Sequence, residues 1–90
     1  MSLDEQFEQM HHFSQALESF NERLRISMTD LTDRHEAVSP IWQDSFRRTY
    51  DMEWNPFEEH MKMYLQREAL AYSQFLETKL KYLQAYLFGG

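Results

Sequence analysis

The chain has 90 residues and no cysteine, and its formal net charge is −6, from 15 acidic and 9 basic residues. This length predicts one domain, and the missing thiols exclude disulfides and thiolate metal sites. Because the basic residues are dispersed, we expect no nucleic-acid binding, which needs a basic face against the phosphates. No apolar run approaches the roughly 20 residues of a membrane-spanning helix. We therefore expect no membrane insertion and a protein that is cytoplasmic when synthesised, with export without a cleaved signal left open.

Apolar side chains recur every three or four residues from Leu3 to Val38, which is typical of an amphipathic helix. The sequence predicts a helix over 4–38, roughly 50 Å long at 1.5 Å per residue. Both glycines are the last two residues, Gly89 and Gly90. No interior glycine supplies the positive-φ turns of phosphate-binding loops and tight β-hairpins. The predicted fold class is all-α.

The dipeptide Ser39-Pro40 predicts a new helix start, with Ser39 as the N-cap and Pro40 in the first helical position. Proline also disfavours the α conformation for Ser39, so the first helix is expected to end by Val38. We predict a turn over 39–44 and a second helix over 41–87. Because the connection is short, the two helices should form an antiparallel hairpin.

A second start signal, Asn55-Pro56, leaves two alternatives for the second half of the chain. Either residues 40–54 form a separate short helix, or one helix continues with a kink near Pro56. The apolar stripe runs through the proline without a change of phase, which favours the single kinked helix. That stripe comprises Trp42, Phe46, Tyr50, Trp54 and Phe57.

The apolar stripes are wider than the seam between two helices requires. Phe75, Tyr82 and Tyr86 broaden the stripe of the second helix. We therefore predict a homodimer, or a complex with a related helical hairpin, that completes a four-helix bundle. The predicted helix–helix interface comprises Phe7, Met10, Leu17, Phe20, Leu24, Leu31, Trp54, Phe57, Met61, Leu65, Tyr72, Leu76, Leu80 and Leu83.

Polar side chains show no pattern typical of a catalytic site, so we predict a non-enzyme with no cofactor and no small-molecule substrate. Glu8 and His11 form Glu-x-x-His, the spacing with which ferritin-like bundles bind two metal ions. A metal-binding bundle is therefore an alternative, although it requires further carboxylates on facing helices. His35 lies on the apolar stripe and is expected to be partly buried.

Trp42 lies near the middle of the chain, at the predicted turn between two long helices. We expect Trp42 and Phe46, one helical turn apart, to form an apolar plug over the hairpin tip. The length, acidic charge, absent cysteine, hairpin and central tryptophan resemble the WXG100 family of small helical hairpins, which has a Trp-x-Gly motif in this position. The aromatic residues that follow along the second helix are also similar to the family pattern.

The resemblance implies a head-to-tail dimer of hairpins and a role as a substrate, chaperone or partner in type VII secretion. Asp44 stands where the family has glycine, although aspartate tolerates turns and can cap a helix. The family's export tag, Tyr-x-x-x-Asp/Glu, matches only Tyr64–Glu68, which lies within the predicted second helix. An adaptor subunit of another helical assembly needs the same amphipathic faces, so it remains open as an alternative.

Overall fold

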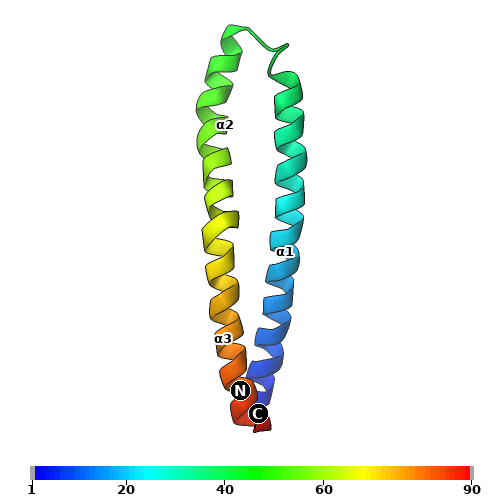
Figure 1. Ribbon diagram of the computed structural model, residues 1–90, viewed down its shortest axis with the longest axis vertical. Helices are drawn as coiled ribbons and strands as arrows, with labels where there is room; N and C mark the ends of the chain where they lie inside the picture. Colours follow the sequence, from blue (N-terminus) through cyan, green and yellow to red (C-terminus); the bar gives the residue numbers. More distant parts are fainter. Residues whose placement is uncertain (1, 90) are drawn as a thin grey trace.

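The computed structural model describes residues 2–89, and these form a long antiparallel helical hairpin (Figure 1). One arm is α1 (Leu3–Val38), and the other contains α2 (Ser45–Met63), a π-helical turn (Tyr64–Glu68) and α3 (Ala69–Phe88). The described residues contain no strand. The first turn of α1 and the last turn of α3 lie at the end of the hairpin opposite the connecting turn (Figure 1). The predicted all-α hairpin is confirmed.

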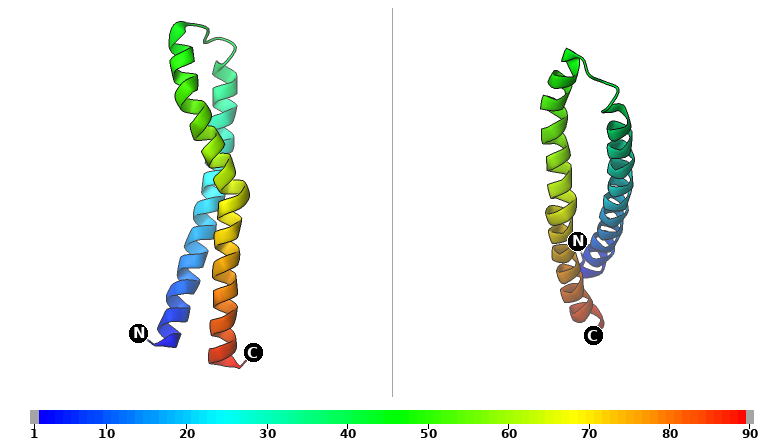
Figure 2. Two further views of the ribbon diagram at one scale, coloured as in Figure 1. Left: turned by 90° about the vertical axis from the view of Figure 1, so that its left-hand side faces the viewer. Right: turned by 45° about the horizontal axis from the view of Figure 1, so that its top comes forward.

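The hairpin is a rod rather than a globule. It measures 64 × 21 × 17 Å and has a radius of gyration of 19.5 Å, whereas a compact chain of this length would have about 12 Å. Seen from the side, the two arms cross each other at a shallow angle (Figure 2). The interior is thus one seam between two helices, and none of the large side chains among the described residues is completely buried.

Helix α1 begins where the sequence provides a cap. The Ser2 hydroxyl accepts a hydrogen bond from the amide of Glu5 at 3.2 Å, and Asp4 and Glu5 complement the positive end of the helix dipole. The helix runs to Val38, so its bounds agree with the predicted range to within one residue. Its length matches the rod expected from the apolar periodicity.

The connecting turn differs from the prediction, because Ser39 is not the N-cap of the second helix. Ser39 keeps α conformation (φ −50°, ψ −47°) and ends α1, with its amide donating to the carbonyl of His35. The second helix begins at Ser45 rather than near residue 41, and Asp44 caps it. The Asp44 Oδ1 atom accepts from the amide of Phe46 at 3.0 Å. An extended aspartate, whose carboxylate can accept several hydrogen bonds, is a better cap than a serine whose hydroxyl is already occupied.

Arg47 is the reason that the Ser39 hydroxyl is occupied. Its guanidinium donates to the Ser39 carbonyl at 2.6 Å, the Ser39 hydroxyl at 2.7 Å and the Trp42 carbonyl at 3.0 Å. Its Nε atom also donates to the Asp51 carboxylate at 3.1 Å. The side chains of Arg47 and Asp51 are 22% and 33% exposed. Charge-assisted bonds of this kind fix the turn from the side of α2.

Pro56 lies inside α2, which is unbroken from Ser45 to Met63. Residues on both sides of the proline therefore belong to one helix, and 40–54 do not form a separate one. A proline leaves the carbonyl four residues earlier without its helical donor. Here that residue is Met52, which is 71% exposed and lies outside the seam.

The departure from α-helical geometry comes later, at the π-helical turn Tyr64–Glu68. Across this turn, the buried residues Trp54 and Ala69 are fifteen positions apart. After the turn, the buried residues Ala69 and Leu83 are fourteen positions apart. Fourteen residues are two heptads, which return a side chain to the same side of a supercoiled helix. The π-helical turn therefore absorbs one extra residue and keeps Ala69 and Leu83 facing α1.

The seam buries four apolar residues, Met28, Trp54, Ala69 and Leu83, and one polar residue, Asn21. Two of the predicted interface residues, Trp54 and Leu83, are among them. Eight are partly buried: Phe7, Met10, Leu17, Leu24, Met61, Leu65, Leu76 and Leu80. The other four are exposed and do not pack within the seam: Phe20, Leu31, Phe57 and Tyr72.

Candidate functional site

The two broad faces of the hairpin differ sharply in polarity, and a simple rule separates them. Successive residues of an α-helix are rotated by about 100°. In two antiparallel right-handed helices, the residue just before each interior position therefore points to one broad face of the hairpin. The residue just after each interior position points to the opposite face. The rule applies to both arms. The two helices run in opposite directions, so their residues follow one another in opposite senses of rotation when both helices are viewed from the same end of the hairpin.

The first of these faces is apolar. Phe20 precedes buried Asn21, and Tyr82 precedes buried Leu83. Every exposed large apolar residue placed on this face by the rule is between 39% and 78% exposed. We call this surface the apolar face and define it by Phe13, Phe20, Leu31 and Val38 of α1, Phe46, Phe57 and Met63 of α2, and Tyr72, Phe75, Tyr82 and Tyr86 of α3.

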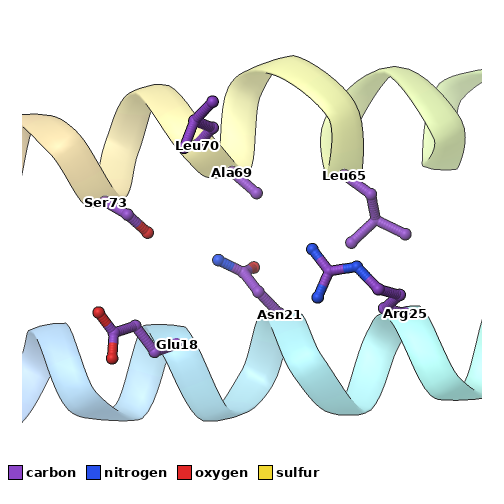
Figure 3. Close-up of a pocket in the computed structure, with 7 residues that line it drawn as sticks. All are labelled: Glu18, Asn21, Arg25, Leu65, Ala69, Leu70 and Ser73. Carbon is purple, nitrogen blue, oxygen red and sulfur yellow. The ribbon is translucent and has the colours of Figure 1, made fainter.

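The opposite face is mainly polar. The residues just after interior positions include Glu22, Thr29, Asn55, Glu77 and Gln84, and the exposed apolar exceptions are Met52, Leu70 and Phe88. A shallow groove of about 340 Å³ lies between the arms, where Glu18 and Arg25 extend from α1 on either side of Asn21 (Figure 3). Arg25 also forms an ion pair with Glu22 at 2.7 Å, with both side chains more than half exposed. This face has the mixed charges of an ordinary solvated helix surface.

The total surface is large for a protein of this mass. The chain exposes 7251 Å², whereas a globular monomer of 11.0 kDa would expose about 5,600 Å². The excess is well above the roughly 800 Å² that each partner buries in a standard protein–protein interface. Large contiguous apolar patches on soluble proteins usually mark such interfaces. The apolar face is therefore the candidate functional site.

An aromatic cluster at the hairpin tip forms one end of this site. The ring of His35 stacks on Trp54 with centroids 4.6 Å apart and on Tyr50 at 5.5 Å. Trp42 packs against Tyr50 at 5.0 Å. A groove of about 240 Å³ opens here, and its apolar lining includes Leu31, Val38, Trp42 and Tyr50. The predicted partial burial of His35 agrees with this position.

The predicted plug of Trp42 and Phe46 is not formed. Phe46 is 74% exposed, because it precedes the interior residue Arg47 and so points to the apolar face. Trp42 instead turns toward Tyr50, and its indole Nε1 donates to the Asp44 carboxylate at 2.8 Å. Asp44 thus holds the tryptophan and caps α2 with the same carboxylate oxygen.

Replacing Asp44 with alanine should lower the free energy of unfolding by about 1–2 kcal/mol, since it removes an N-cap and the indole partner together. Thermal unfolding followed by circular dichroism measures this change. Asp44→Asn keeps both acceptor bonds and should be close to wild type. Equal stability of the alanine and asparagine variants would contradict the capping role.

At the other end of the hairpin, Glu8 and His11 do not meet further metal ligands. Among residues 2–89, no group of three or more histidines, cysteines or acidic residues is placed to hold a metal ion. His11 instead stacks on Phe7 with centroids 6.0 Å apart, and Phe7 packs edge-on against Phe88 at 5.7 Å. These contacts tie the two ends of the described chain together.

Sequence reasoning missed a polar contact at the centre of the seam. The Tyr64 hydroxyl donates to Asn21 Oδ1 at 2.7 Å, and Asn21 is only 7% exposed. Tyr64 is the first residue of the π-helical turn. The signal that could have revealed the turn is the spacing of fifteen, rather than fourteen, between the apolar positions Trp54 and Ala69.

In the described part of the chain, no helix is long and apolar enough to cross a membrane. No protein-family model matches the chain, and neither a curated protein nor a solved structure with significant similarity was found.

Proposed function

We propose that the protein is a non-catalytic interaction module that packs the apolar face against another helical hairpin. The observation that carries this proposal is the concentration of exposed aromatic and aliphatic residues from both arms on one broad face. Burying such a face is worth about 25 cal/mol for each Å² of apolar surface removed from water. A monomer leaves this surface in water and does not gain that free energy. Assembly into a four-helix bundle is therefore favoured.

A second copy of the chain is the partner that the charges favour. Glu53 and Lys79 border the apolar face on α2 and α3, each thirteen residues from Gln66 near the middle of that arm. In a copy laid on this face and reversed end to end, Glu53 of each hairpin meets Lys79 of the other. A copy laid on the same face with its tip at the same end as the first brings neither pair together. Such rim charges influence orientation and association rate more than affinity.

The mass of the assembled protein in solution tests this proposal directly. Light scattering should give about twice the 11.0 kDa of one chain at concentrations of roughly 10 μM, since an interface of standard size commonly reaches this affinity or better. A mass of one chain at that concentration would contradict self-assembly.

Reversing the rim charges tests the orientation. Either Glu53→Lys or Lys79→Glu alone should weaken the dimer several-fold, because each creates two like-charged pairs in a symmetric dimer. The double variant should recover most of the wild-type affinity at low salt, and the difference should shrink at high salt. A double variant no stronger than the single ones would exclude the reversed arrangement.

We further propose that this module acts as a WXG100-like protein in type VII secretion, as substrate, chaperone or partner. The support is the tryptophan at the hairpin tip. Asp44 departs from the motif glycine, but it is compatible with the bend because it caps the second helix. Co-expression with a complete type VII secretion system, followed by assay of the culture medium, tests the role. Retention of the protein in the cells would count against it as a substrate.

A further inference from the structure

Helix α3 carries two apolar stripes, and the π-helical turn decides which of them faces α1. The buried stripe is aliphatic and includes Ala69, Leu76 and Leu83. The second stripe is aromatic and exposed: Phe75 and Tyr82 are 74% and 73% accessible to solvent. One residue of rotation, about 100°, separates the two stripes.

The aromatic stripe is the one in phase with α2. Phe75 and Tyr82 lie 21 and 28 residues after buried Trp54, which is three and four full heptads. If the arm were α-helical throughout, these residues would continue the seam started by Trp54. The single extra residue in the Tyr64–Glu68 turn moves them outward and brings the aliphatic stripe inward.

We propose that the hairpin has two packing registers, which interconvert when the π-helical turn becomes α-helical and α3 rotates by about one residue. The aliphatic register is the one observed, and the aromatic register buries the stripe that now forms the α3 part of the apolar face. Conversion would withdraw Phe75 and Tyr82 from any partner. The proposal concerns a single hairpin, so it does not depend on self-assembly.

Two features hold the hairpin in the observed register. The Tyr64 hydroxyl, at the start of the π-helical turn, bonds to nearly buried Asn21 of α1. In the aromatic register, heptad spacing places two charged residues in the seam: Glu68, fourteen residues after Trp54, and Lys79, 21 residues after Glu58. Both charged groups are exposed in the observed register, and moving them between helices carries a desolvation penalty.

Removing those charges should reverse the preference. The variant Glu68→Leu/Lys79→Leu gives the aromatic stripe an uninterrupted apolar seam while leaving the aliphatic stripe intact. A partner that binds one stripe would shift the same equilibrium, because it would bind one register better than the other. The double variant therefore imitates, within one chain, the effect of such a partner.

Thiol labelling reads out the register, because the wild-type chain contains no cysteine. Single cysteines are introduced by Tyr82→Cys or Leu83→Cys, and the labelling rates are measured at a dilution where light scattering shows one chain. In the wild-type background, position 83 should react at least about tenfold more slowly than position 82, since it lies in the seam. In the Glu68→Leu/Lys79→Leu background, this order should invert.

A matched control is Glu77→Leu/Lys81→Leu. It also removes one glutamate and one lysine, but from an exposed ion pair that lies outside both stripes. This control should keep the wild-type labelling order. If the Glu68→Leu/Lys79→Leu variant also keeps that order, the second register does not exist. Fast labelling at both positions would equally overturn the proposal, because the aromatic packing would then fail to support a folded hairpin.

Discussion

Replacing Leu83 with aspartate should unfold the hairpin, whereas the same change at the neighbouring Tyr82 should leave it folded but unable to self-assemble. Leu83 is 5% exposed in the seam, while Tyr82 is 73% exposed on the apolar face. A carboxylate forced into an apolar seam costs several kcal/mol, a large part of the 5–15 kcal/mol that stabilises a typical domain. At Tyr82 the charge remains in water until a partner approaches.

Circular dichroism and light scattering together separate these outcomes. Leu83→Asp should lose most of its helical signal at 25 °C, and Tyr82→Asp should keep the signal but show the mass of one chain. Gln84→Asp, on the polar face, supplies the matched control and should change neither property. Loss of helix in Tyr82→Asp, or a folded Leu83→Asp variant, would show that the two stripes of α3 are wrongly assigned.

Replacing Trp54 with alanine should be the most damaging truncation in the tip half of the hairpin. Trp54 is 7% exposed and packs against His35, Tyr50 and Phe57 with ring centroids 4.6, 6.1 and 5.6 Å away. Its indole also donates to Glu58 at 3.1 Å. Truncating a buried aromatic residue to alanine usually costs about 3–5 kcal/mol.

For a domain of this size, each kcal/mol lowers the melting temperature by roughly 4–8 °C, so Trp54→Ala should melt roughly 15 °C or more below wild type. Phe75→Ala removes a comparable ring from a position that is 74% exposed, and its monomer should melt close to wild type. Comparison at a dilution where both are monomeric removes any effect of assembly. Similar shifts for the two variants would contradict the assignment of Trp54 to the core.

The element boundaries show where local sequence signals succeed and where they mislead. The first helix was predictable because its apolar period continues without interruption from Leu3 to Val38. The start of the second helix was predicted wrongly, because Ser39-Pro40 has the composition of a helix start. Arg47, eight residues away, takes the Ser39 hydroxyl and carbonyl. Local cap rules do not include a competitor from the next helix.

The interface prediction mixed two surfaces, because apolar periodicity does not say which partner covers a residue. Leu83 packs inside the hairpin, whereas Phe20 and Tyr72 lie on the apolar face. Separating these groups requires the interior position of each arm, and the extra residue of the π-helical turn shifts that position between α2 and α3.

The amino-acid sequence by itself determined the length, acidity, all-helical character and hairpin connection of this protein, because these follow from composition and local periodicity. Tertiary structure decided which side chains are interior, since that depends on contacts between residues far apart in the chain. The bond between Asn21 and Tyr64, 43 residues apart, is the clearest example. The apolar face results from the same contacts, because they decide which apolar residues the opposite arm covers and which stay exposed.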